Sequence, residues 1–160
     1  MNVAIRLAKE EEAFIVHQVM IAAFEEYRQM DVPSSALNET VDSIRQKLRS
    51  GTEQALLCFN SNQPIGTVRF TINGASLYFF RLSVCPKARG KGVAKAMLHW
   101  LEDYAKECKV QEISCRVRAS IPKNIYLYES AGYHICEEKI VMSNDVIPVK
   151  TVVMKKYLAK

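Results

Sequence analysis

The longest helical pattern in the chain, from about Gly92 to Cys108, lies between two strand-like runs, Leu77–Val84 and Glu112–Val117. Apolar residues recur through it at steps of three and four, as on one face of an amphipathic helix. A strand, a crossover helix and a second strand in one sheet pair in parallel, because a tight hairpin cannot join parallel neighbours. This unit restricts the chain to folds with at least one parallel strand pair.

The rest of the chain predicts short elements whose close spacing favours antiparallel neighbours. Gly51 and Gly132 follow two of the helical patterns, at positions where glycine ends a helix without steric cost. We expect an α/β (α+β) fold with a mixed, mostly antiparallel central sheet and helices on both faces. The remaining predicted helices are Glu10–Tyr27, Leu37–Leu48 and Lys123–Ala131, and the remaining strands are Val3–Leu7, Gln54–Phe59, Pro64–Ile72, Tyr133–Val141 and Val149–Tyr157.

Length and composition fit one domain over residues 1–160. The chain has 49% hydrophobic and 24% charged residues, the balance of an ordinary globular protein. It has no apolar run long enough to cross a bilayer and no N-terminal pattern typical of a signal peptide. We therefore expect a cytoplasmic protein without a membrane partner.

The cysteines and histidines form no pattern that indicates a disulfide framework or a metal site. The five cysteines are an odd number, and no two lie two or three residues apart, so we expect reduced thiols in small core positions. Cys85 is the single candidate for a reactive thiol. His17, His99 and His134 share no face at ligand spacing, so we expect no metal.

A basic turn with two glycines connects the strand Leu77–Val84 to the long helix. A helix start carries unpaired N–H groups and partial positive charge, and glycine lets an anion approach the backbone closely. The turn lacks the Ser/Thr of a Walker A loop and the third glycine of a dinucleotide fingerprint. Alone, it fits a phosphate site or an ordinary flexible turn. Its residues are Gly90 and Gly92, with the basic side chains of Lys87, Arg89, Lys91 and Lys95.

Two motifs resemble those of the GNAT-type N-acetyltransferase superfamily. The turn, Arg89-Gly90-Lys91-Gly92-Val93-Ala94, is similar to that family's acetyl-CoA signature, Gln/Arg-x-x-Gly-x-Gly/Ala. The family's second signature, Leu-Tyr-x-x-x-Gly-Phe, is similar to Leu127-Tyr128-Glu129-Ser130-Ala131-Gly132-Tyr133. The predicted order of elements also resembles the family's. The resemblance implies an enzyme that uses acetyl-CoA as co-substrate, in which a primary amine attacks the thioester directly within a ternary complex.

The resemblance also implies roles for individual residues. Backbone groups of Leu82, Ser83 and Val84 would bind the pantetheine arm and the thioester oxygen. Tyr128 stands where the family keeps the general acid for the departing thiolate, although it could be a core aromatic only. Asn124, four residues earlier on the same helix face, could contact the cofactor in place of an asparagine that this chain lacks. The pyrophosphate would be bound by the N–H groups of Arg89, Gly90, Lys91, Gly92, Val93 and Ala94.

The acceptor side departs from the family's pattern. Arg116 stands where some members place a glutamate base, and it is either a forked partner for an acceptor carboxylate or phosphate, or a solvent-facing strand residue. The segment Tyr27–Ser35 lies where the family lines its acceptor pocket, so Tyr27 is a candidate substrate-binding residue, although an ordinary turn has a similar composition. Glu25, Glu26 and a water relay are the candidate bases, although a solvated position on the helix explains each glutamate equally simply. The acceptor is a small-molecule or peptide amine that the sequence does not identify.

Two other functions fit part of the sequence. The net charge of +5 suits a nucleic-acid-binding module, but the aromatic residues occupy core-like positions and the basic cluster lies on one turn, so we expect no nucleic-acid partner. The missing base also fits a catalytically degenerate sensor or scaffold that binds acetyl-CoA without turnover. The C-terminal strands Tyr133–Val141 and Val149–Tyr157 could support a homodimer.

Overall fold

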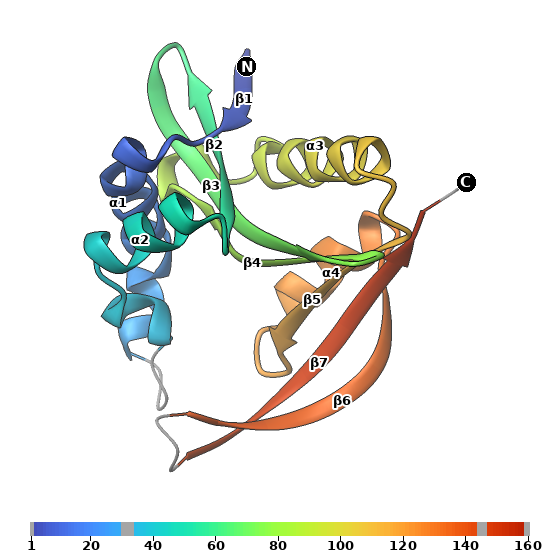
Figure 1. Cartoon of the computed structure of the whole chain (residues 1–160). Helices are drawn as coiled ribbons and strands as arrows, with labels where there is room; N and C mark the ends of the chain where they lie inside the picture. Colours follow the sequence, from blue (N-terminus) through green and yellow to red (C-terminus); the bar gives the residue numbers. More distant parts are fainter. Residues whose placement is uncertain (1, 30–33, 144–146, 159–160) are drawn as a thin grey trace. The chain divides into compact units, whose positions relative to one another are not determined.

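The computed structural model describes residues 2–29, 34–143 and 147–158. Its strands form one sheet in the order β1-β2-β3-β4-β5-β7-β6 (Figure 1). The β4–β5 pair is parallel, whereas β1–β2, β2–β3, β5–β7 and β6–β7 are antiparallel. The mixed, mostly antiparallel sheet predicted from the sequence is confirmed. The strands are β1 (Val3–Leu7), β2 (Gln54–Asn60), β3 (Gln63–Asn73), β4 (Ser76–Val84), β5 (Glu112–Arg118), β6 (His134–Ser143) and β7 (Ile147–Tyr157).

Helices are present in every region where the sequence predicts them, with shifted ends. No helix among the described residues has the length and hydrophobicity of a membrane-spanning segment. The α-helices are α1 (Ala13–Phe24), α2 (Val41–Ser50), α3 (Val93–Glu107) and α4 (Pro122–Ser130), and the 3₁₀ helices are η1 (Glu10–Glu12), η2 (Glu25–Gln29), η3 (Ser35–Asn38) and η4 (Pro86–Ala88).

The helix predicted over Leu37–Leu48 is two elements. The backbone of Glu39, which follows η3, is extended at φ −75° and ψ 147° and interrupts the helical pattern. Thr40 then caps α2, because its Oγ1 accepts the Ser43 N–H at 3.1 Å and satisfies a donor at the helix start. At the other end Gly51 adopts the left-handed conformation at φ +76°, so the predicted glycine stop is confirmed.

The helix predicted over Glu10–Tyr27 is also divided, because the tighter turns η1 and η2 flank α1. Glu12, at the η1–α1 junction, accepts the Lys9 N–H at 2.9 Å. The same carboxylate receives two hydrogen bonds from Arg6 of β1, at 2.8 and 2.7 Å. Glu12 therefore ties the start of this helical region to the first strand.

The described residues group into two compact units. The first unit comprises Met1–Thr71 and Phe80–Trp100, and the second comprises Ile72–Phe79 and Leu101–Lys160. Strands β3 and β4 and helix α3 each contribute residues to both units.

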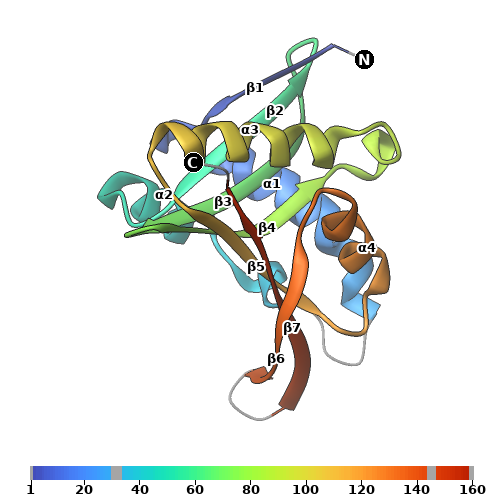
Figure 2. The same cartoon turned by 90° about the vertical axis from the view of Figure 1, so that its right-hand side faces the viewer.

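In the first unit, helices cover both faces of β2 and β3. Helices α1 and α2 pack on one face, and the start of α3 covers the other (Figure 2). Gly66 of β3 permits the second contact, because a Cβ there would lie 3.0 Å from the Met97 side chain and 3.2 Å from Val93. The predicted placement of helices on both faces is confirmed. The cluster beneath α1 and α2 consists of Ala13, Val16, Met20, Ala36, Ile44, Ala55 and Leu57.

The second unit is built on strand β7, which pairs with β5 on one side and β6 on the other. Helix α4 packs its Tyr128 against Phe79 of β4 and against Tyr133, with ring centroids 5.5 and 6.1 Å apart in edge-to-face geometry. All three rings are buried. Edge-to-face aromatic contacts of this kind stabilise a core beyond simple area burial.

Candidate active site

The predicted pantetheine segment is the last part of β4, in the first unit. The parallel β4–β5 ladder joins Ser76–Tyr78 to Glu112–Ser114 and does not extend to Leu82–Val84 among the described pairs. Arg81, immediately before that segment, has φ +57°, a left-handed conformation within a strand. The Ser83 hydroxyl donates a hydrogen bond to the Arg81 carbonyl at 2.9 Å and is buried. The regular strand geometry is therefore interrupted where the sequence predicts cofactor contacts.

The glycine turn has the backbone shape that an anion site needs. Gly90 and Gly92 have φ +74° and +81°, and a Cβ at either position would meet nothing within 4 Å. Helix α3 then begins at Val93, and its first helical hydrogen bond runs from the Ala96 N–H to the Gly92 carbonyl at 3.0 Å. Open space beside two glycines at a helix start fits a diphosphate.

The side chains around the turn differ in their surroundings. Lys87, Lys91 and Lys95, which lie in the turn or within a few residues of it in the sequence, are exposed. Arg89 instead contacts the end of the α1 region: Nη1 donates to the Glu26 carboxylate and Nη2 to the Ala23 carbonyl, both at 2.9 Å. Its backbone N–H donates to the Pro86 carbonyl at 3.3 Å. The Arg89 N–H is therefore already engaged within the protein. Of the N–H groups predicted to bind the pyrophosphate, those from Gly90 onwards are the ones that we consider further.

Both glutamates considered as bases form ion pairs. Glu26 pairs with Arg89 at 2.9 Å, and Glu25 pairs with Arg28 at 2.6 Å. The hydrogen bond from Arg28 lowers the pKa of Glu25. A carboxylate stabilised in its ionised form accepts a proton less readily. The ion pairs of Glu25 and Glu26 therefore disfavour either residue as the base.

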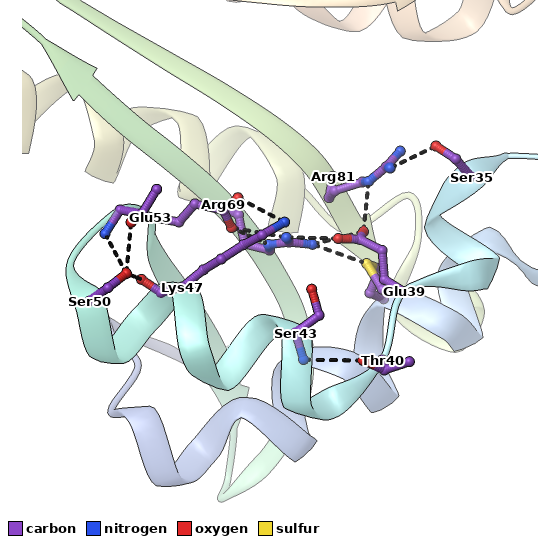
Figure 3. Close-up of polar contacts among 11 residues, drawn as sticks. Ser35, Glu39, Thr40, Ser43, Lys47, Ser50, Glu53, Arg69 and Arg81 are labelled. Atoms are coloured by element: carbon purple, nitrogen blue, oxygen red, sulfur yellow. Dashed lines mark hydrogen bonds and ion pairs between the residues drawn. The ribbon is translucent and has the colours of Figure 1, made fainter. Parts of the chain in front are cut away.

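A buried ion-pair network, which no sequence motif indicates, includes Arg81 (Figure 3). Arg69 of β3 is only 1% exposed, and its two Nη atoms donate to the two oxygens of Glu39 at 2.9 and 2.8 Å. Arg69 also donates through Nε and Nη2 to Glu53 at 3.1 and 2.9 Å. Arg81 donates from Nε to Glu39 at 3.0 Å and from Nη2 to the Ser35 hydroxyl at 2.9 Å.

The arginines of the network keep Glu39 ionised, and an aromatic ring covers one face of Arg69. Burial alone would raise the pKa of Glu39, but the hydrogen bonds and charges of Arg69 and Arg81 together lower it. The ring of Phe80 lies under the Arg69 guanidinium at 5.1 Å, a cation–π contact. The sequence sign of the buried cation is a single arginine in an otherwise uncharged strand, and alternation of side chains alone would place it in solvent.

The predicted site residues of β5 and α4 lie in the second unit. Tyr128 is 7% exposed in the aromatic cluster, and Asn124, one turn earlier on α4, is half-buried. Burial raises the pKa of neighbouring Tyr133 above its ordinary value, so that hydroxyl stays protonated. Arg116 is exposed on β5, opposite Val153 of β7. Exposure fits both interpretations of Arg116, as an anion partner or as a solvent-facing residue.

The predicted acceptor segment is described in part. Tyr27, in η2, is half-buried and makes an edge-to-face contact with Phe24 at 5.5 Å. Residues 30–33 lie outside the described residues. Ser34 caps η3 by accepting the Ala36 N–H at 3.2 Å, as an ordinary turn serine does. Ser35 accepts a hydrogen bond from Arg81, so this segment contacts the left-handed residue of β4.

The cysteine predictions are partly wrong. Cys58 and Cys115 are buried as expected, whereas Cys108 and Cys136 are exposed. Burial raises the pKa of Cys85, the candidate reactive thiol, and raises that of Cys115 to about 12. A raised pKa disfavours the reactive thiolate. Among the described residues, no group of three or more His, Cys, Asp or Glu side chains could hold a metal ion.

Comparisons with known proteins give a matching family model and solved structures of similar fold. The model of the acetyltransferase (GNAT) family matches residues 17–133, a span that includes the glycine turn and Tyr128. A search of curated protein sequences gives no match.

Solved structures with similar folds cover nearly the whole chain. The PaiA N-acetyltransferase of Thermoplasma acidophilum, in complex with coenzyme A, has a TM-score of 0.80 at 16% identity, covering 98% of this chain and 99% of that one. The putative acetyltransferase yncA of Salmonella typhimurium, with acetyl-CoA, has a TM-score of 0.79 at 16% identity, covering 100% and 96%. The ribosomal-protein-alanine N-acetyltransferase of Brucella melitensis has a TM-score of 0.79 at 21% identity, covering 97% and 99%. At these identities the likeness establishes the fold.

Proposed function

The chain belongs to the acetyltransferase (GNAT) family, and we propose that it transfers an acetyl group from acetyl-CoA to a primary amine. The observation that carries this proposal is the glycine turn at the start of α3, which lies within the matched region. Its two left-handed glycines border open space. A solved relative in fold contains acetyl-CoA and another contains coenzyme A, which supports the same ligand here.

In this proposal the turn binds the pyrophosphate of acetyl-CoA. N–H groups from Gly90 to Ala94 donate to phosphate oxygens, and the exposed Lys87, Lys91 and Lys95 add positive charge. The arrangement assigns Arg89 mainly to holding the turn against the α1 region, since its guanidinium binds Glu26 and the Ala23 carbonyl. Arg89 would thereby support the cofactor site by fixing the backbone of the turn.

Leu82, Ser83 and Val84 hold the pantetheine arm through their backbone groups, and a backbone N–H stabilises the negative charge that develops on the thioester oxygen. The acceptor nitrogen forms a bond to the acetyl carbonyl carbon while the carbon–sulfur bond breaks. The amine loses one proton and the CoA sulfur gains one. Fixing both reactants side by side supplies much of the rate.

Tyr128 acts on the departing sulfur. A free tyrosine has a pKa near 10 and a thiol near 8.5, so complete proton transfer is uphill by about 2 kcal/mol in water. We therefore assign Tyr128 a hydrogen bond to the thiolate, with Asn124 contacting the cofactor from the same helix face. Since Glu25 and Glu26 both form ion pairs, water is the base that we favour for the amine.

The acceptor is a small-molecule or peptide amine, and Arg116 and Tyr27 are its candidate contacts. An exposed arginine on β5 suits an acceptor with a carboxylate or phosphate group. The fold neighbour from Brucella melitensis is named for a ribosomal protein's alanine. That name supports an amine as the nucleophile for this chain without selecting the acceptor.

Three measurements test the proposal against its alternatives. Titration calorimetry with CoA and acetyl-CoA up to millimolar concentration should give saturable heat, and its absence would refute the proposal. Release of free thiol should then be followed across a panel of amines that includes polyamines, amino acids and peptide N-termini. Saturable heat without turnover on any amine would favour the sensor or scaffold. A salt-sensitive shift of duplex DNA or RNA with no acetyl-CoA effect would favour the nucleic-acid module.

A further inference from the structure

Arg81 has a backbone conformation that is out of place in a strand. Its φ is +57°, in the left-handed region that side-chain-bearing residues rarely adopt. Among the described residues, the other non-glycine residues with positive φ lie in turns, where that conformation is common. Those residues are Ser61, Asn62 and Lys109.

The Arg81 side chain is held at two points within the first unit. Nε donates to Glu39 Oε2 at 3.0 Å, and Nη2 donates to the Ser35 hydroxyl at 2.9 Å. These partners precede α2, so the left-handed residue of β4 is tied to a segment far away in sequence (Figure 3). The side chain of Arg81 is 26% exposed, whereas that of Glu39 is 16% exposed.

Glu39 is itself fixed by the core. Both of its oxygens accept hydrogen bonds from the buried Arg69, whose guanidinium rests on the Phe80 ring. A forked arginine–carboxylate pair defines the direction of the carboxylate as well as its charge. Glu39 therefore presents its second contact to Arg81 in one orientation.

We propose that Glu39 and Ser35 are positioning residues: by holding Arg81 in the left-handed conformation, they preset the backbone of Leu82–Val84 for the acyl-CoA. This inference rests on the proposed function. Without the two side-chain contacts, residue 81 relaxes toward an ordinary strand conformation, and ligand binding has to restore its left-handed conformation. The free energy needed to return a non-glycine residue to the left-handed conformation corresponds to roughly a tenfold loss of affinity for the acyl-CoA.

Two substitutions at residue 81 separate backbone positioning from the loss of the ion pair. Arg81→Ala and Arg81→Gly both remove the contacts with Glu39 and Ser35, but only glycine accepts φ +57° without strain. Both leave the Arg69–Glu39 fork in place, so the buried charges stay paired. Arg45→Ala is the matched control, since it removes an arginine from the exposed pair with Asp42 in the same unit.

The experiment measures the dissociation constant of CoA by calorimetry and the hydrogen exchange of the Leu82–Val84 amides without ligand. Arg81→Ala should weaken CoA binding about tenfold and speed exchange at these amides by a similar factor. Arg81→Gly and Arg45→Ala should stay within about twofold of wild type in both measurements. This difference is much smaller than the roughly tenfold effect expected for Arg81→Ala.

The outcomes separate the two proposals. If the wild-type protein binds CoA and the alanine and glycine variants bind it equally well or equally poorly, the positioning role is wrong and the proposed function stands. If the wild-type protein gives no heat with CoA, the proposed function fails and the positioning role fails with it.

Discussion

Arg69 and Glu39 form a forked ion pair, with both Nη atoms within 2.9 Å of the two carboxylate oxygens and the arginine side chain 1% exposed. The remaining N–H donors of Arg69 reach Glu53 and the sulfur of Met20. Breaking a buried ion pair by removing one partner leaves an uncompensated charge, which is more destabilising than never having the pair. This pair therefore makes the stability of the first unit sensitive to single substitutions.

Arg69→Met should lower the free energy of unfolding by about 3–5 kcal/mol, because Glu39 and Glu53 lose the buried cation between them. Urea denaturation measures the change. Asp42→Asn removes the exposed partner of Arg45, 84% exposed, and should change stability by less than about 0.5 kcal/mol. Equal effects of the two substitutions would show that the buried network contributes no more to the free energy of unfolding than an exposed ion pair.

Gly92→Ala should weaken CoA binding at least about tenfold, because it strains a residue at φ +81° and puts a methyl group beside the turn. Gly51→Ala is the matched control, since that glycine also has a positive φ and open space but ends α2. Both variants should lose roughly 1 kcal/mol of stability. Only Gly92→Ala should lose affinity in calorimetry, and equal CoA affinities would contradict a phosphate site at this turn.

Tyr128→Phe should reduce kcat by about 10- to 100-fold while CoA binding is retained, because phenylalanine keeps the packing on Phe79 and Tyr133 but cannot donate to the thiolate. Tyr126→Phe, at an exposed position on the same helix, should leave kcat unchanged. Thiol release with the best acceptor of the panel measures both. A Tyr128→Phe enzyme with the wild-type rate across pH would remove this residue from the mechanism.

Arg116→Ala should raise the KM of an anionic acceptor by about tenfold or more and change that of a neutral acceptor little, if the guanidinium forms a forked pair with the anion. Arg116→Lys, which keeps the charge without the fork, should recover part of the loss. The comparison requires one acceptor of each kind from the amine panel. Equal effects on both acceptors would leave Arg116 as a solvent-facing strand residue.

Glu12 should make stability depend on acid pH. The hydrogen bond from Arg6 is the main reason that the pKa of Glu12 falls from 4.5 to about 2. A carboxyl with a depressed folded-state pKa stabilises the fold above the unfolded pKa, and this contribution disappears as pH falls through the folded value. Between pH 5 and pH 2.5 the stability advantage of wild type over Glu12→Gln should shrink.

Urea denaturation at both pH values measures this advantage. Glu11→Gln, at the exposed neighbouring position, is the control and should differ from wild type by the same small amount throughout. A constant gap between wild type and Glu12→Gln would show that the Arg6 contact does not stabilise the fold through charge.

Much of the fold was predictable because its signals are local. The helical periodicity of α3, the strand runs that flank it and the left-handed glycines at the end of α2 and in the turn all depend on residues a few positions apart. The parallel pairing of β4 with β5 follows from chain connectivity. The division of the second predicted helix at Glu39 was missed, because a capping threonine and an extended residue do not disturb the apolar spacing.

The sequence by itself determined the family motifs, the glycine turn and the order of the elements, since each is written in neighbouring residues. Only the tertiary structure decided which charges meet. Glu39 pairs with Arg69 across 30 positions and with Arg81 across 42, and Arg89 reaches Glu26 across 63. No periodic pattern specifies such pairs. The sequence does not distinguish a strand arginine whose side chain lies in solvent from one whose side chain lies in the core, because the surrounding packing selects its partner.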